Sequence, residues 1–222
     1  NSNMPQQIER MDPARTVLII VDMENDFVKP GASFEVQAGR EMLPKLKELI
    51  AFCRGTGVSV IYTTHAHRAD GSDAGRFADI YPAIAEGKGL VDGSDGIKIY
   101  DQIAPEPGEV VIKKHRYSAF FGTDLDIILR GLSTNTVIVT GVTTENCCHA
   151  TARDAMFHDY RVAFISDCTA TFDYPDVGCG ALSADELHRY TLITLAFSTA
   201  HVMTAAECME KMSADASKAA AE

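Results

Sequence analysis

The segment TVIVTGVTTENCCHATARDAMF, residues 136–157, carries the clearest structural pattern in the chain. Its first five residues are apolar or β-branched, which is typical of a strand buried on both faces. Gly141 is expected to end this strand, and a helical pattern begins within a few residues. A buried strand that leads directly into a helix is the repeating unit of parallel α/β sheets.

The expected helix has an apolar stripe at Cys148, Ala152, Ala155 and Met156, the spacing of a helix that packs on a sheet. Cys147 lies about 100° around the helix from this stripe. In the first turn it would lie near open backbone N–H groups at the positive end of the helix dipole, and both features favour a thiolate. The adjacent cysteines could equally be small apolar filler at a strand–helix junction.

Three polar residues lie at the start of this expected helix: Thr143, Thr144 and Asn146. Threonine and asparagine side chains accept hydrogen bonds from the open amides of a first helical turn. We therefore expect these side chains to cap the helix.

The composition narrows the class of protein. The chain has 222 residues, of which 46% are hydrophobic and 23% charged, values that suit one globular domain with a large core. A formal net charge of −11 argues against nucleic acid or an anionic membrane as the main partner. No apolar run approaches the ~18 residues of a membrane span, and residues 1–12 form a polar tail without the apolar core of a signal peptide.

The six cysteines are scattered, without a C-x-x-C pair or the spacing of a zinc site. This pattern is typical of reduced thiols in a cytoplasmic protein. We expect no metal and no other cofactor.

A second buried strand is expected at TVLIIV, residues 16–21, and Asp22 follows it directly. The carboxyl ends of parallel strands are where open α/β sheets bind their ligands. Asp22 is therefore either a functional acid or a loop residue that caps a turn.

Two further strands also lead into polar residues. The run 58–64 continues into His65-Ala66-His67, which is either a pair of metal ligands or a polar loop, since no third ligand is evident. The short run 109–112 leads to Lys113 and Lys114.

The rest of the chain alternates between helical and strand patterns. Helices are expected at 40–54, near 77–85, at 124–131 with Thr123 as N-cap, and from Ser183 onward with Leu187, Tyr190, Leu192 and Leu195 facing the core. Strands are expected at 160–165, ending at Ser166 and Asp167, and at 201–204 as a short edge strand. Residues 68–107 form a connection long enough to be a lid or binding loop, and residues 213–222 a frayed tail.

This alternation predicts a single α/β domain over residues 1–222. We expect a three-layer α/β/α architecture with a doubly wound, mostly parallel, Rossmann-like sheet of about six strands.

Asp22, Lys114 and Cys147 each follow a strand, so all three should face one crevice at the carboxyl edge of the sheet. Together they meet the needs of amide hydrolysis by a thiol. Lys114 would lower the pKa of the thiol, and Asp22 would take its proton and return it to the leaving amine. The amides of Thr143 and Cys147 could bind the oxyanion. A plain ion pair between Asp22 and Lys114 at a sheet edge is the simpler alternative.

Three segments carry a resemblance to a known family: LIIVDMENDF (18–27), KHRYSAFFGTDLDIILR (114–130) and VTGVTTENCCHATARDA (139–155). In order and spacing they resemble the isochorismatase-like cysteine hydrolases. That family includes nicotinamidases, N-carbamoylsarcosine amidases and the ureido-type triuret, biuret and ureidoacrylate hydrolases.

The resemblance implies that Asp22, Lys114 and Cys147 form the catalytic triad, because Cys148 stands where family members usually have an aliphatic residue. It also implies a non-proline cis peptide at Val142–Thr143. The family lines its pocket at Phe27, Tyr117 and Phe120, although these could equally be core aromatics, and we expect Asn146 to contact the substrate as well.

Departures from the family pattern narrow the substrate. Nicotinamidases of the family bind a metal through Asp-x-His after the second strand, and here His65 replaces the aspartate. Isochorismatases proper lack the catalytic cysteine. The RYSAFF and ENCC segments look most similar to the ureido-type amidases.

We therefore expect a cysteine hydrolase that cleaves a C–N bond of a small amide or ureido compound through a thioester and releases ammonia. The expected assembly is a homodimer or homotetramer. Nicotinamidase-like and N-carbamoylsarcosine amidase-like activities are the alternatives within the family. A thiol-based redox sensor or small-molecule-binding domain is the alternative of a different class, but a sensor would not need an aspartate at a strand end.

Overall fold

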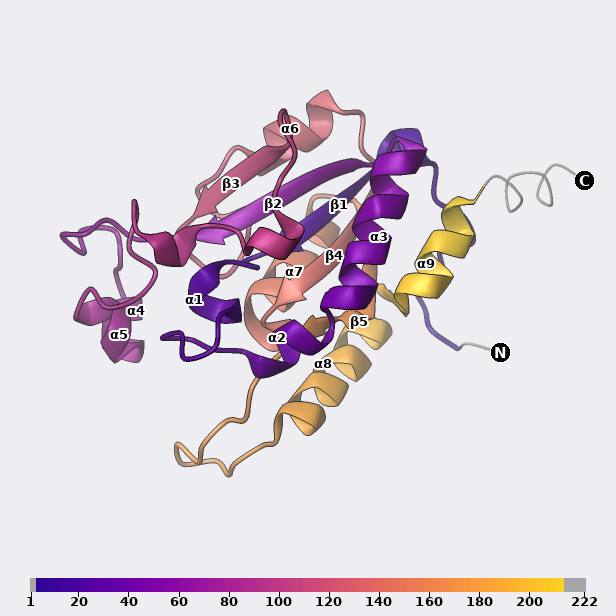
Figure 1. The fold of residues 1–222 in the computed structure, drawn as a ribbon. Coiled ribbons are helices and arrows are strands. Elements are labelled where there is room, and N and C mark those ends of the chain that lie inside the picture. The colour runs from indigo at the N-terminus through magenta and orange to yellow at the C-terminus, as the bar shows by residue number, and fades with distance from the viewer. Residues whose placement is uncertain (1–2, 214–222) are drawn as a thin grey trace, which may run out of the picture.

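The apolar runs of the sequence form one six-stranded sheet in a computed structural model that describes residues 3–213 (Figure 1). The strands are β1 (Thr16–Val21), β2 (Ser59–His65), β3 (Val110–Lys114), β4 (Thr136–Val142), β5 (Arg161–Ala170) and β6 (His201–Met203). Their order is β3-β2-β1-β4-β5-β6, and every neighbouring pair is parallel. This is the strand order of a doubly wound Rossmann-type sheet, as the alternating pattern predicts.

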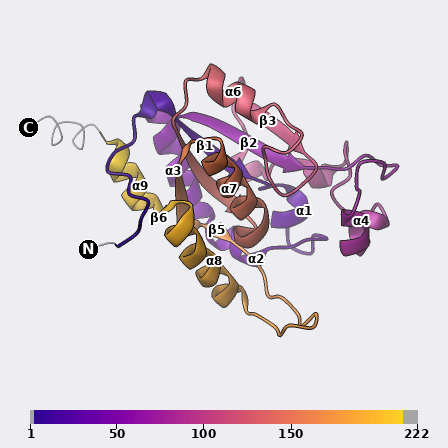
Figure 2. The ribbon, with the colours of Figure 1, turned by 180° about the vertical axis from the view of Figure 1, so that it is seen from behind.

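Helices cover both faces of the sheet, which confirms the three-layer architecture (Figures 1 and 2). The helices are α1 (Asn25–Val28), α2 (Gln37–Glu41), α3 (Leu43–Thr56), α4 (Phe77–Ile80), α5 (Pro82–Ala85), α6 (Leu125–Gly131), α7 (His149–Phe157), α8 (Ala184–Ser198) and α9 (Ala205–Met212). Within residues 3–213, none of them is long and apolar enough to cross a membrane.

Alternate side chains of the central strands divide the core into two clusters, one for each face. Leu18 and Ile20 of β1 pack with Leu46 of α3 on one face. Val17 and Ile19 of β1 pack on the other face, together with residues of α6, α7 and α8. Because both faces are covered, the strands are continuously apolar, as expected for buried parallel strands.

Several element boundaries differ from the sequence expectations. The helix expected at 40–54 is two helices, α2 and α3, which meet at Met42. The helix expected near 77–85 is likewise divided into α4 and α5, since Pro82 begins a new helix. Asp124 is the N-cap of α6, although the Thr123 hydroxyl does accept the amide of Leu125 at 3.2 Å.

Strand β5 is longer than expected, so Ser166 and Asp167 lie inside it and not at its end. Phe164 pairs with Val139 and Thr169 with Gly141, so that residues 165–168 bulge opposite a single position of β4. Such a bulge bends the strand and changes the direction of its side chains.

On α8, the capping box of Ser183 and Glu186 confirms the expected helix start. Thr191 and Leu195 form its buried side. Tyr190, which we expected to face the core, is 45% exposed.

The first residues of the described chain pack against the domain and do not form a loose tail. Ile8 and Met11 are buried in the core. The Ile8 amide donates to Nδ1 of His201 at 2.9 Å, and the Met11 amide donates to the carbonyl of Lys211 at 3.1 Å. The frayed tail expected at 213–222 lies outside the described residues, apart from Ser213.

Gly141 does not end β4 as expected, because the strand continues to Val142. Its φ of +110° lies in a region that favours glycine. A Cβ at this position would overlap the backbone of Val21 on the neighbouring strand. The glycine thus lets β1 and β4 stay paired up to their carboxyl ends.

We predict that Gly141→Ala lowers the free energy of unfolding by about 3 kcal/mol or more, because the methyl group forces the two central strands apart. Gly131→Ala at the end of α6 is the matched control. A Cβ added at Gly131 would have no neighbouring atom within 4 Å, and its φ is ordinary, so the change should be neutral or slightly stabilising. Denaturant unfolding of both variants measures the difference, and equal stabilities would contradict this account of β4.

Candidate active site

Asp22, Lys114 and Cys147 meet at the carboxyl edge of the sheet. The Lys114 ammonium lies 2.8 Å from Oδ2 of Asp22 and donates to Sγ of Cys147 at 3.3 Å. Its third partner is the carbonyl of Arg116, at 2.8 Å. The side chains of Asp22 and Lys114 are fully buried, so their attraction is only weakly screened by water.

The strand order explains this meeting. Asp22 follows β1, Lys114 ends β3, and Cys147 lies in the turn that follows β4. These strands lie on both sides of the point where the chain reverses its direction of winding across the sheet, the usual ligand site of doubly wound folds.

Asp22 is held in an unusual backbone conformation, with a φ of +53°. Positive φ is uncommon for residues other than glycine and occurs often at functional sites. Thr63 on β2 fixes it, since the Thr63 hydroxyl donates to Oδ1 of Asp22 at 2.7 Å. The Asp22 amide in turn donates to Oγ1 of Thr63 at 3.1 Å. The Asp22 Oδ2 atom is thereby aimed at Lys114.

Cys147 lies in one π-helical turn, Thr144–Cys148, that precedes α7. It is Cys147 that lines the cavity, whereas Cys148 is fully buried among core residues with Ala152 and Ala155. This placement agrees with the predicted helical faces. The peptide between Val142 and Thr143 is cis, as the family resemblance implies.

The predicted side-chain caps of this helix are absent from the turn. The Thr143 side chain makes no capping bond, and Thr144 Oγ1 is paired with Nδ1 of His188 at 2.7 Å. Asn146 donates from Nδ2 to the hydroxyl of Tyr174 at 3.0 Å. Thr144 and Asn146 thus pair with side chains of neighbouring segments and not with the first amides of the helix.

The charge state of the cysteine also differs from the sequence expectation. Burial is the largest influence and raises the pKa of Cys147. Lys114 acts in the opposite direction, but the negative charge of Asp22 offsets much of its effect because the two form a neutral pair. The resting group is therefore a thiol, with a carboxylate next to it.

Burial alone would lower the pKa of Lys114. The charge of Asp22 beside it outweighs burial and raises that pKa, so the lysine is an ammonium ion. A permanent cation beside the sulfur is available to stabilise the thiolate once the proton has left.

A cavity opens in front of Cys147, with about 420 Å³ of empty space including its mouth. Of the residues expected to contact a substrate, Phe27, Tyr117 and Asn146 line it, together with Thr143 of the expected oxyanion site.

Phe120 does not line the cavity. Its ring stacks on His158 and Tyr160 at centroid distances of 5.2 and 6.3 Å, within the core beneath α6 and α7. Strand β3 ends at Lys114, and the following loop turns this aromatic away from the site. Of the two roles considered for Phe120 from the sequence, a pocket-lining residue or a core aromatic, the structure shows the second.

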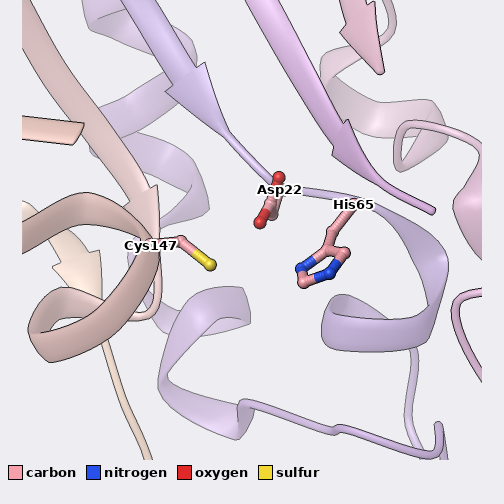
Figure 3. A group of neighbouring side chains, drawn as sticks. All are labelled: Asp22, His65 and Cys147. Atoms are coloured by element: carbon pink, nitrogen blue, oxygen red, sulfur yellow. The ribbon is translucent and has the colours of Figure 1, made fainter. Parts of the chain in front are cut away.

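His65 is a site residue whose position the sequence analysis did not anticipate. Figure 3 shows its ring at the end of β2, next to Asp22 and facing Cys147. It lines the cavity, and its Nε2 lies 2.9 Å from Nε2 of His67. Burial lowers the pKa of His65 well below its ordinary value, so the ring is neutral.

Two clusters of potential metal ligands among the described residues contain histidine, and neither is suited to bind a metal. The ligand atoms of Asp22, His65 and Cys147 lie within 4.8 Å of one another, but the Lys114 ammonium occupies the place beside two of them.

His67, Asp73 and His115 form the second group. Nδ1 of His115 lies 2.7 Å from the carbonyl of Ala66, which only accepts, so this nitrogen carries a proton and cannot bind an ion. None of the three lines the cavity in front of Cys147.

Glu24, two residues after Asp22, is a fully buried acid that the sequence analysis did not single out. Its Oε1 accepts the amide of His65 at 2.6 Å, and its Oε2 has no hydrogen-bond partner among the described residues. Burial, followed by the charge of Asp22, raises the pKa of Glu24 well above its ordinary value. This environment therefore favours the protonated form of the carboxyl in the folded protein.

We predict that Glu24→Gln, the neutral isostere, stabilises the protein increasingly as the pH rises above 4.5, the ordinary glutamate pKa. Above that pH the unfolded chain gains stability by ionising Glu24, while the folded protein keeps it protonated, so wild-type stability falls with rising pH. Below pH 4.5 the two proteins should melt alike.

Glu35→Gln is a control of opposite sign. The Gly31 amide and Arg40 lower the pKa of Glu35, so this variant should lose stability above pH 4.5. Melting temperatures from pH 4 to 8 test both. A Glu24→Gln protein less stable than wild type at pH 7 would show that Glu24 is needed as an anion.

We predict that exhaustive treatment with a chelator leaves activity unchanged, because Lys114 already supplies the positive charge beside Asp22 and Cys147. Hydrolysis rates before and after treatment are the measurement. Loss of activity that zinc restores in the wild type, but not in His67→Asn, would show instead that this histidine is a ligand.

Comparisons with known proteins identify the family of this chain. The family model of the isochorismatase domain matches residues 16–207. The crystal structure of a cysteine hydrolase from Pseudomonas syringae pv. phaseolicola is similar, with 36% identity, a TM-score of 0.90, and coverage of 95% of this chain and 98% of that one.

Two further relatives are named as amidases. Ureidoacrylate amidohydrolase RutB from Pantoea ananatis is 32% identical over 174 residues, which cover 71% of this chain and 70% of the relative. N-carbamoylsarcosine amidase from Thermoplasma acidophilum is 26% identical, with a TM-score of 0.67 and coverage of 86% and 96%. With the domain match over most of its length, the chain belongs to the isochorismatase family.

Proposed function

We propose that this protein hydrolyses the C–N bond of a small amide or ureido compound, with Cys147 as nucleophile and Asp22 and Lys114 as its partners. The observation that carries the proposal is one buried ammonium, 2.8 Å from a carboxylate and 3.3 Å from a thiol. A hydrolase acting on non-peptide C–N bonds is also the enzyme class to which the family and the amidohydrolase relative point.

The first step transfers the thiol proton of Cys147 to Asp22, and Lys114 stabilises the thiolate that forms. Sulfur then attacks the substrate carbonyl. Asp22 returns the proton to the leaving nitrogen, which departs as ammonia and leaves a thioester on Cys147. A water molecule, deprotonated by Asp22, attacks the thioester and releases the acid, and the thiol is restored.

The oxyanion of each tetrahedral intermediate needs hydrogen-bond donors placed in advance. We assign this role to the amides of Thr143 and Cys147, because both residues line the cavity beside the sulfur. The positive end of α7 points in the same direction and favours a developing negative charge.

Residues 68–107 contribute Tyr81, Ile84 and Leu90 to the cavity wall. We propose that this segment acts as the lid of the site. Its position over the sulfur would exclude bulk water while the thioester forms.

The protonation state of Cys147 argues against the alternative of a redox sensor. Sensor cysteines are accessible and have a low pKa, since the thiolate is the form that oxidants attack. Here the sulfur is buried and its pKa is raised. A thiol that ionises only when a carboxylate takes its proton is suited to acyl transfer.

A homodimer or homotetramer and a cytoplasmic location remain predictions from the sequence. Sedimentation of the purified protein would measure the first.

We predict that Cys147→Ser lowers turnover of amides by about 10³-fold or more. A serine hydroxyl gives up its proton to Asp22 much less readily than a thiol does, and it is the weaker nucleophile. Asp22→Asn should have a similar effect on turnover, because the thiol proton then has no acceptor. Mass spectrometry of a quenched wild-type reaction should find an acyl group on the peptide that contains Cys147.

Cys148→Ala is the matched control, since the neighbouring sulfur is buried away from the cavity and donates to the Thr140 carbonyl, at 3.7 Å. It should retain turnover within about threefold. Full activity of Cys147→Ser, or an acyl group on a different residue, would contradict the cysteine-hydrolase proposal.

A further inference from the structure

The wall of the cavity in front of Cys147 is largely apolar. Its far side consists of Phe27, Phe34, Ile84, Leu90 and Phe172. The hydroxyls of the two wall tyrosines, Tyr81 and Tyr117, are 2.7 Å apart and share one hydrogen bond, which takes up the proton of one of them. An acyl group in contact with these side chains gains from leaving water only if it is itself apolar.

No lysine or arginine side chain among residues 3–213 lines this cavity. Lys114 reaches it only from behind the sulfur, where it donates to Cys147 and to the carbonyl of Arg116 and forms an ion pair with Asp22. A substrate carboxylate in the cavity would therefore be a buried charge without a partner, an arrangement that is strongly unfavourable.

A hydrogen-bond chain fixes the one amide side chain of the wall. The Tyr174 hydroxyl donates its only proton to Oε2 of Glu145 at 2.6 Å, so its oxygen must accept from Nδ2 of Asn146. Thr171 donates to the same carboxylate at 2.8 Å and helps to hold it. The orientation of Asn146 is thereby set, and its Oδ1 and the second N–H of Nδ2 remain for a ligand.

We propose that this cavity selects uncharged amides with an apolar acyl group, and that Asn146 recognises the substrate by accepting its amide N–H. The inference rests on the proposed amide hydrolysis and names its substrate class. Glu145 and Tyr174 are positioning residues, which act through Asn146. A substrate carboxylate would find no lysine or arginine among the described residues of the cavity wall, and the single N–H of Asn146 that Tyr174 leaves over cannot neutralise its charge.

The first test compares two isosteric amides, 5-methylhexanamide and glutaramate, which differ in an isopropyl group against a carboxylate. At pH 7 the ratio of their kcat/KM values should favour the uncharged amide by about 100-fold or more. Equal kcat/KM values would overturn the inference while leaving the proposed function intact.

Phe172→Arg supplies the missing cation at a wall position that is 37% exposed, so the new charge can remain hydrated in the unliganded protein. This variant should reduce the ratio of kcat/KM for 5-methylhexanamide to kcat/KM for glutaramate by about tenfold or more. Phe172→Met, which is long and uncharged, should leave the ratio as in wild type. An unchanged ratio in the arginine variant would contradict the charge argument.

The role of Asn146 is tested by comparing 5-methylhexanamide with the methyl ester of the same acid, which lacks an N–H. Asn146→Leu should lower kcat/KM for the amide by about 10-fold to 100-fold and affect the ester much less. Tyr174→Phe should do the same more weakly, mainly through KM. Equal losses on amide and ester would indicate a purely structural role and overturn the assignment.

These outcomes also separate the inference from the proposed function. If neither amide is hydrolysed and no acyl group forms on Cys147, the proposed function fails and the inference fails with it. Hydrolysis of both amides with a thioester on Cys147, but without discrimination between them, refutes the inference alone.

Discussion

The ion pair between Asp22 and Lys114 is the interaction on which the proposed chemistry depends. Both side chains are fully buried, so each charge is stable there only because the other is present. Removing one partner of such a pair usually costs about 3–5 kcal/mol, since it leaves an unpaired charge in the interior. The pair is therefore a fixed, neutral dipole, and the sulfur of Cys147 lies next to its positive end.

This arrangement explains why the cysteine is a thiol at rest and can still become a nucleophile. An isolated lysine beside a buried sulfur would pull the proton off, whereas the pair has almost no net charge, and burial then decides the pKa. Once Asp22 accepts the proton, the dipole becomes an ammonium beside a thiolate, which is a second neutral pair. The charge moves by a few ångströms, and the interior never holds an uncompensated charge.

Much of the fold could be predicted because it depends on local patterns. Continuous apolar runs such as Thr16–Val21 allowed the buried strands to be predicted, and the polar residues at their carboxyl ends allowed the site to be predicted. The bulge of β5, the length of β4 and the π-helical turn at Cys147 were missed. Each of these arises from contacts between neighbouring strands or elements, as at Gly141, which no single run of residues encodes.

The residues of the site also divide into those that a local sequence pattern predicts and those that depend on contacts between distant segments. Asp22, Lys114 and Cys147 were found because each has a characteristic chemistry at a strand end. Glu24, His65 and Tyr174 take their significance from burial or from a partner distant in sequence, such as Tyr174 with Glu145. Phe120 shows the converse, because an aromatic residue close to a motif was placed in the core by the direction of its loop.

The most direct test of the account is the protonation state of Cys147 in the resting protein. Thiolates absorb near 240 nm, so the difference spectrum between wild type and Cys147→Ser, recorded from pH 6 to 9, reports the ionisation of this residue. The account predicts no thiolate absorbance from Cys147 at neutral pH, because burial beside the neutral Asp22–Lys114 pair raises the pKa of the thiol. A full thiolate signal at pH 7 would contradict it, since Asp22 would then have no thiol proton to accept.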